Sequence, residues 1–152
     1  MFRNLLKLAG TALLATAAAG VNAQSDVYHA ANHDYTVVTV AEDLVQPWAM
    51  AWLPGGDMLI TEKPGRLRVV RNGSLLPEAV PGVPEVFYEG QGGLFDVLPH
   101  PNFNDNRWVY LTYSKKTEGS SATAIARGRF ENDRLTNVVE IFEAQAVGFG
   151  HY

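Results

Sequence analysis

Apolar and polar side chains alternate in short runs along most of the chain, and turn-forming residues separate the runs. In the first half the runs cover residues 35–40, 48–53, 58–62 and 66–71. The last run ends at Asn72-Gly73, which is a strong signal for a tight β-hairpin. A period of two interrupted by tight turns is typical of antiparallel strands. The first half is therefore predicted to be a four-stranded meander.

A Pro-rich connection over residues 77–84 interrupts this pattern, which then starts again. The second set of runs covers residues 94–98, 108–113, 122–130 and 138–143. We find no convincing helix after the first 23 residues. An all-β fold with two groups of four strands is predicted, as in sandwiches, barrels and propellers. Since the two halves share no copied sequence, the preference for a β-propeller rests on the grouping of the strands.

The N-terminus has the three-part layout of a secretory signal. Arg3 and Lys7 make a positive start, residues 8–19 are apolar or small, and Val21-Asn22-Ala23 ends in a small residue suited to cleavage. The apolar part is too short to span a bilayer permanently. A buried N-terminal helix is the alternative, but the segment has no amphipathic pattern. The protein is therefore predicted to be secreted or periplasmic.

The expected layout is a signal peptide at 1–23, a polar leader at 24–34 and a folded part at 35–152. Removal of the signal takes two basic residues away, so the remaining chain is more acidic than the net charge of −4 for the whole sequence. An acidic surface argues against a nucleic-acid partner. The absence of cysteine excludes disulfides, thiolate zinc sites and cysteine nucleophiles. No second apolar stretch is long enough to cross a membrane.

A glycine-rich segment over residues 89–97 (EGQGGLFDV) carries the first candidate chemistry. A dinucleotide-binding loop would need a helix after the glycines, whereas the pattern here predicts a strand. The remaining interpretation from spacing alone is a turn in which glycine permits a positive φ.

Four histidines and two groups of larger side chains are the other candidates. His100 lies between two prolines, where a structural turn is favoured over a metal ligand that lacks visible partners. His29 and His33 are read as surface residues, with copper or nickel binding as the alternative. His151 is either a solvated side chain or a general base. The default expectation is a solvated face for Arg66, Arg68, Arg127 and Arg129, and core packing for Trp48, Trp52 and Trp108.

Five segments, taken together, resemble one known family. They are PWAMAWLPGGDMLITEKPGRLRVV, VPGVPEV, GQGGLFDVLPHPNF, NRWVYLTYS and ATAIARGRF. Their order and spacing over about residues 36–152 resemble the soluble pyrroloquinoline-quinone-dependent aldose sugar dehydrogenases, the glucose/sorbosone dehydrogenase family. The resemblance implies a six-bladed β-propeller of four-stranded blades, of which this chain contains about two.

The resemblance also implies two site residues and two cofactors. His151 matches the catalytic base, which takes the proton of the anomeric hydroxyl, and Gln91 matches a substrate-binding glutamine. Gly150 departs from one branch of the family, which has aspartate there. Pyrroloquinoline quinone and Ca²⁺ are the implied cofactors, and their ligands are expected beyond residue 152, so no metal ligand is assigned. The chain is therefore expected to be an N-terminal fragment that is inactive alone.

The predicted function is oxidation of an aldose at its anomeric carbon to the lactone, with hydride transfer to the quinone and an unidentified electron acceptor. A propeller that binds a carbohydrate or a protein without catalysis is the alternative, because a fold does not fix a function. A calcium-dependent lactonase is ranked third, since the candidate residues are Gln91 and His151 and not a set of carboxylates.

Overall fold

The computed structural model describes residues 26–118 and 120–148, which form strands with one short helix. The chain divides into two units, at residues 1–38 and 39–152. The predicted signal peptide lies outside the described residues. Within the described part, no helix is long and apolar enough to cross a membrane.

The first unit contains a small hairpin. Strands β1 (Val27–His29) and β2 (Asp34–Thr36) pair antiparallel. Tyr28 and Tyr35 stack with ring centroids 5.4 Å apart. The prediction that residues 35–40 form the first strand of the meander is wrong, because only the start of that run is extended and it pairs with β1. Alternation indicates that a segment suits a strand, but it does not identify the edge with which the strand pairs.

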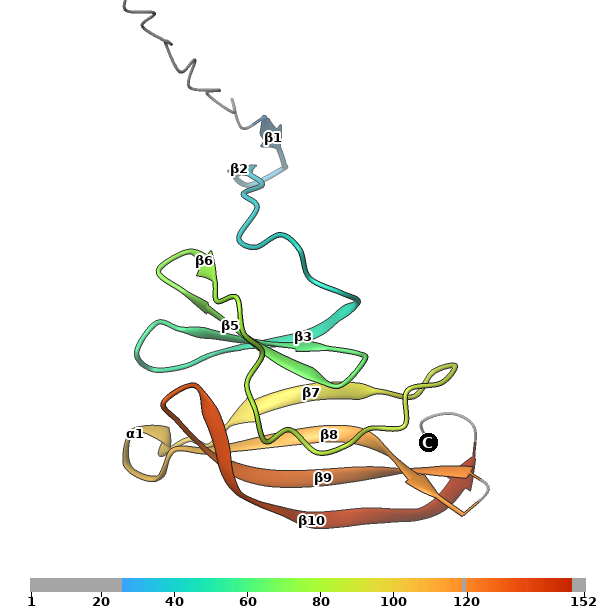
Figure 1. The fold of residues 1–152 in the computed structure, drawn as a ribbon. Helices are drawn as coiled ribbons and strands as arrows, with labels where there is room; N and C mark the ends of the chain where they lie inside the picture. Colours follow the sequence, from blue (N-terminus) through green and yellow to red (C-terminus); the bar gives the residue numbers. More distant parts are fainter. Residues whose placement is uncertain (1–25, 119, 149–152) are drawn as a thin grey trace, which may run out of the picture. The chain divides into compact units, whose positions relative to one another are not determined.

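The second unit contains two four-stranded antiparallel sheets, each a meander (Figure 1). The first sheet has the order β3 (Pro47–Trp52), β4 (Met58–Glu62), β5 (Arg66–Arg71) and β6 (Ser74–Leu75). The second has the order β7 (Leu94–Pro99), β8 (Trp108–Thr117), β9 (Ser120–Glu131) and β10 (Arg134–Gly148). The prediction of two four-stranded groups is confirmed, but the first group contains β6 in place of the predicted strand at residues 35–40. In the first group the fourth strand is the short β6, which follows the predicted hairpin at Asn72-Gly73, where φ is 50° and 76°.

One helical turn, α1 (Phe103–Asn106), lies between β7 and β8, and it is the single exception to the predicted all-β fold within the described residues. Its first residue, Phe103, is buried in the core and is 3% exposed. It ends at Arg107, whose left-handed φ of 57° directs the backbone N–H to the carbonyl of Phe103. A four-residue turn has no apolar period of its own that would reveal it in the sequence.

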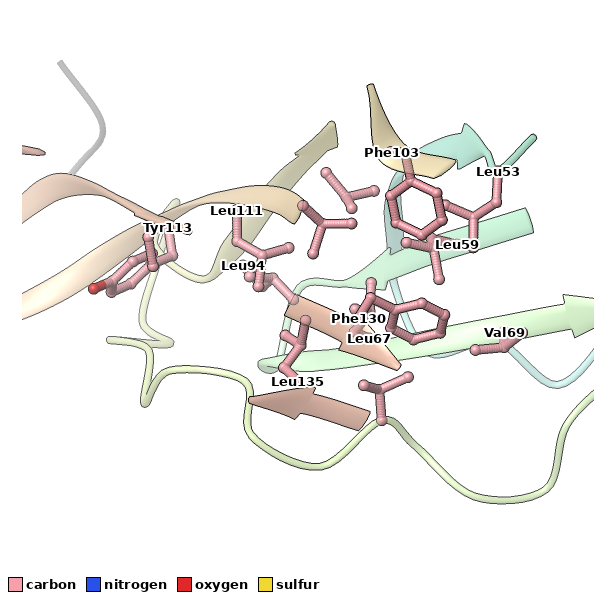
Figure 2. Packing of buried hydrophobic residues seen from close by; sticks show 14 of the residues in the cluster. Leu53, Leu59, Leu67, Val69, Leu94, Phe103, Leu111, Tyr113, Phe130 and Leu135 are labelled. Atoms are coloured by element: carbon pink, nitrogen blue, oxygen red, sulfur yellow. The ribbon is translucent and has the colours of Figure 1, made fainter. Parts of the chain in front are cut away.

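The two sheets share one apolar core. Figure 2 shows side chains from the first sheet, among them Leu59 and Leu67, beside Leu94, Leu111 and Phe130 from the second. A smaller cluster of Met58, Ile60 and Val70 covers the opposite face of the first sheet. All five residues of β4 are therefore buried, and their apolar character serves packing on both faces.

Glu62, at the end of β4, is fully buried, and three groups satisfy its carboxylate. Its oxygens accept hydrogen bonds from Val45 N at 2.6 Å, Arg66 Nε at 2.5 Å and Arg68 Nη1 at 3.4 Å. Arg68 is only 8% exposed, so the expected solvated face is wrong for this residue. The arginine is buried because its second amino group also donates to the carbonyl of Leu76. A buried charge is tolerated when it is paired and hydrogen-bonded in this way.

Replacing Glu62 with glutamine is expected to lower the free energy of unfolding by about 3 kcal/mol, because the buried guanidinium of Arg68 loses its counter-charge. Glu131→Gln is the matched control: it removes a carboxylate that pairs with Arg129 at the surface, and the expected cost is below about 1 kcal/mol. Chemical denaturation of the protein, expressed from its complete reading frame, measures both. Equal losses in the two variants would contradict the assignment.

Arg71 connects the two sheets at the end where β5 finishes. Its guanidinium donates to Asp57 Oδ2 at 2.7 Å and to Asp133 Oδ1 at 2.7 Å. Asp57 belongs to the turn after β3, whereas Asp133 lies in the turn between β9 and β10. The hydrogen bonds to Asp133 and then Asp57 raise the pKa of Arg71 above its usual value, and the bond to Arg71 lowers the pKa of Asp133.

Because the folded-state pKa of Asp133 is depressed, its contribution to stability is present above the ordinary carboxyl pKa of 3.8 and is lost as pH falls through the folded value. Asp133→Asn is therefore expected to lower the thermal midpoint at pH 7, and this difference from the parent should shrink as the pH is lowered below about 4. Asp26→Asn, at an exposed position of the first unit, is the control. A difference that is constant with pH would exclude an ionic contribution.

Candidate functional site

Gln91 lies in the loop that leads into β7, and its side chain is exposed. The loop is a tight turn in which Gly92 N donates to the carbonyl of Glu89 at 2.8 Å. Gly90 occupies the left-handed region, with φ of 55°. The turn thus places an amide that can both donate and accept hydrogen bonds at an accessible position.

Two glycines after Gln91 allow the backbone to approach other segments closely. A Cβ on Gly92 would lie 2.4 Å from the carbonyl oxygen of Phe87, and one on Gly93 would lie 2.3 Å from that of Lys63. Gly93 also has a φ of 145°. The prediction of a glycine turn that needs positive φ is confirmed, and close approach of the backbone is a second reason for the glycines.

Replacing Gly93 with alanine is expected to destabilise the protein by at least about 2 kcal/mol, because the new methyl group meets a backbone oxygen at a φ that is strained for alanine. Gly55→Ala is the matched control, since a Cβ there has no neighbour within 4 Å and no left-handed φ is involved. Thermal and denaturant unfolding of both variants checks this. A Gly93 variant as stable as the Gly55 variant would contradict the close approach.

The surroundings of the Gln91 loop come from both sheets. Lys63, which follows β4, accepts a hydrogen bond from Leu94 N through its carbonyl at 2.9 Å, and its ammonium donates to the carbonyl of Gly90 at 3.0 Å. Tyr88 Oη donates to Gln46 Oε1 at 2.9 Å, and Gln46 directly precedes β3. The segments before the first strand of each sheet, at Gln46 and Gln91, are therefore close to one another.

A charged cluster on β8 and β10 lies at the same end of the second sheet, where Tyr113 pairs with Leu94. Tyr113 Oη donates to Glu140 at 2.8 Å, and Lys115 bridges Glu140 and Glu143 at 2.8 and 2.6 Å. Burial, followed by the bond to Glu140, raises the pKa of Tyr113 to about 12. The bond to Lys115 lowers the pKa of Glu140. At neutral pH the phenol therefore stays protonated and donates, so it is not suited to act as a base.

The structure gives His100 the structural role that the sequence favoured. Its Nδ1 accepts from Asn102 N at 2.9 Å and lies 2.9 Å from Asn106 Nδ2, so it organises the turn that contains α1. His29 pairs with Asp34 at 3.0 Å. Within residues 26–118 and 120–148, no group of three histidine, aspartate or glutamate side chains is arranged to hold a metal ion.

The expectation that the three tryptophans pack in the core is wrong. Trp48 and Trp52 lie on β3, at the edge of the first sheet, and are 51% and 61% exposed. Trp108 is half-buried beneath Arg127, whose guanidinium carbon lies 4.2 Å from the ring centroid. Arg129 follows at 5.9 Å, so the two arginines share one face as predicted but stack on an indole instead of being fully solvated.

The two four-stranded antiparallel meanders define the class of protein as an all-β fold of the propeller type. Comparison with known proteins identifies the family. The family model for glucose/sorbosone dehydrogenase matches residues 44–151. The chain belongs to the glucose/sorbosone dehydrogenase family. Its two sheets are blades of the predicted β-propeller, so both the predicted family and the predicted fold class are confirmed.

The chain is 39% identical over 122 residues to the aldose sugar dehydrogenase YliI of Escherichia coli K12. The matched region covers 78% of this chain and 33% of YliI. A solved glucose dehydrogenase matches with a TM-score of 0.67 and 44% identity, over 70% of this chain and 33% of that one. The PQQ-bound aldose sugar dehydrogenase of Streptomyces coelicolor matches with a TM-score of 0.63 and 24% identity, over 71% and 33%, and supports the fold alone. The chain thus spans about a third of the length of the curated relatives it matches.

Of the two site residues predicted from the sequence, Gln91 is in the described part and His151 lies outside it. The structure adds Lys63, Tyr88 and Gln46, which the sequence analysis missed. Tyr88 lies only three residues before Gln91, whereas Lys63 and Gln46 are separated from Gln91 by whole strands and reach the loop only when the two sheets pack. The sole available signal was that the segments before 47 and before 94 each precede the first strand of a predicted group.

Proposed function

We propose that the protein oxidises an aldose at its anomeric carbon to the lactone. The topology of the second sheet is the observation that carries this proposal. Four antiparallel strands return the chain to the end at which it began, so β10 finishes at the end where the Gln91 loop leads into β7 (Figure 1). His151 follows three residues after β10, so the chain order is compatible with Gln91 and His151 serving one site.

In this proposal Gln91 binds the sugar hydroxyls, since its amide both donates and accepts. His151 takes the proton of the anomeric hydroxyl, a task suited to an imidazole near neutral pH. The anomeric carbon becomes the lactone carbonyl when its hydrogen leaves as hydride with the electron pair of the C–H bond. Pyrroloquinoline quinone, which the Streptomyces coelicolor structure contains, would supply the hydride acceptor, and calcium would polarise it.

The described residues do not fit the binding of that quinone or calcium. Lys63 contacts the Gln91 loop but donates to Gly90, and Lys115, on β8, is bound by two glutamates. Neither is free to neutralise a cofactor carboxylate, and no metal-binding cluster is found among the described residues. We therefore assign the quinone and calcium ligands to no residue of the described part.

The remaining parts of the proposal concern the chain as a whole. Residues 1–23 are proposed to be a secretory signal and 24–34 a leader, which places residues 35–152 in the propeller of an exported protein. The 152 residues alone are proposed to be inactive and poorly soluble. The outer face of the second sheet supports this, since Leu98 and Ile141 are 61% and 49% exposed there, and an uncovered apolar face favours association.

The test is reduction of a redox dye by a panel of aldoses, with quinone and Ca²⁺ added, using the protein expressed from its complete reading frame. His151→Ala is expected to lower kcat by about 10²–10⁴-fold, the usual contribution of a general base. Gln91→Ala is expected to lower kcat/KM about tenfold, as one lost hydrogen bond to substrate implies.

The matched controls are His33→Ala and Gln145→Ala, both at exposed positions, and they should retain parental rates. A folded protein with no quinone-dependent activity towards any aldose would contradict the proposal. Sugar binding without turnover would then favour the carbohydrate-binding propeller.

A further inference from the structure

Lys63 occupies the turn between β4 and β5 and contacts the segments before the first strand of both sheets. Its backbone N–H donates to the carbonyl of Gln46 at 3.0 Å, and its carbonyl accepts from Leu94 N at 2.9 Å. These two backbone bonds fix where the lysine lies, whatever its side chain does. Figure 1 shows this turn and the loop before β7 at the same end of the sheets.

The side chain of Lys63 adds a contact that the backbone does not make. Its ammonium donates to the carbonyl of Gly90, the residue directly before Gln91, at 3.0 Å. The same ammonium lies 5.8 Å from the ring centroid of Trp48, so it sits between an aromatic ring and the loop. Gly90 has a left-handed φ of 55°, and this turn conformation sets the direction of its carbonyl. The charged ammonium that donates to this carbonyl stabilises the conformation.

A second contact to the same segment is made by a neutral pair. Tyr88 Oη donates to Gln46 Oε1 at 2.9 Å, and Gln46 itself has a left-handed φ of 49°. A non-glycine residue in that region persists only where its surroundings fix it. Here the bond from Lys63 N to the carbonyl of Gln46 does so. Lys63 thus connects the Gln46 segment through its backbone and the Gln91 loop through its side chain.

We propose that Lys63 is a positioning residue for aldose binding: its ammonium holds the loop that presents Gln91. This inference rests on the proposed function for the part that concerns the sugar. The alternative is that this exposed hydrogen bond of a surface lysine has no effect on the conformation of the loop or on substrate affinity. The two differ in what a substitution changes, because a positioning contact alters substrate affinity while a surface contact does not.

Lys63→Met tests the inference, since it keeps the length of the side chain and removes the charged donor. If Gln91 binds the sugar equally in the ground state and the transition state, a displaced loop raises KM about tenfold and leaves kcat within about threefold. Lys63→Arg restores a cationic donor and is expected to return KM to within about threefold of the parent. Lys116→Met, at an exposed position near the end of β8, is the matched control and should leave KM unchanged.

A second measurement is independent of activity. Hydrogen exchange of the peptide covering residues 88–94 is expected to accelerate severalfold in Lys63→Met and to match the parent in Lys63→Arg and Lys116→Met. Unchanged exchange in Lys63→Met would overturn the positioning role, whatever the kinetics. Faster exchange with an unaltered KM would overturn its link to the sugar.

These outcomes separate the inference from the proposed function. A parent protein without aldose activity contradicts the proposed function and, with it, the sugar-binding part of the inference, while the exchange measurement still decides whether Lys63 holds the loop. If Lys63→Met lowered the thermal midpoint and kcat but left KM constant, the role of Lys63 would be structural only. This outcome would also overturn the inference.

Discussion

The structure depends on one close approach of backbone to backbone, between Lys63 of the first sheet and Gly93-Leu94 of the second. The hydrogen bond from Leu94 N to the carbonyl of Lys63 joins the sheets where β7 begins, and a residue with a Cβ at 93 does not fit there. Thr61 Oγ1 donates to the carbonyl of Phe95 two residues further on. With this contact in place, the inner faces of the two sheets meet and the shared core of leucine, valine and phenylalanine side chains is closed.

The same approach produces the candidate site. The chain must turn sharply before β7 in order to reach the first sheet, and Gly90, Gly92 and Gly93 permit that turn. A side chain in the middle of such a turn has few neighbours, which is why Gln91 is exposed. Packing of the sheets thus supplies rigidity to a loop whose central residue is left available to a ligand, the arrangement in which functional residues are commonly found.

The sequence predicted the fold well because a period of two and turn residues are local signals. The strands β3, β4, β5 and β7 match the predicted runs to within one residue at each end, and β8 and β9 contain their predicted runs but are longer. The failures concern information that is not local. The run at residues 35–40 suits a strand, but only its first two residues are in one, and they pair with β1. Trp48 and Trp52 are apolar but lie at the edge of a sheet, and Arg68 is charged but buried by the carboxylate of Glu62. Gln91 was found through resemblance to a family motif, whereas Lys63 and Gln46 were not, because only the packing of the sheets brings them to the loop.

Because of the contacts of Lys63, substitutions in the Gln46 segment and in the Gln91 loop are expected to have non-additive effects on free energy. Its backbone binds the Gln46 segment and its side chain binds the Gln91 loop, so a shift of either segment changes the position of the other. Glu62, the preceding residue, binds Val45 N with its buried carboxylate and so constrains the same segment from within the protein. Residues that share partners in this way have coupled effects on free energy. The loop that presents Gln91 is thus connected, through two adjacent residues of one strand end, to the buried ion pair of the first sheet. The position of the Gln91 side chain is therefore set by the packing of both sheets and not by the glycine loop alone.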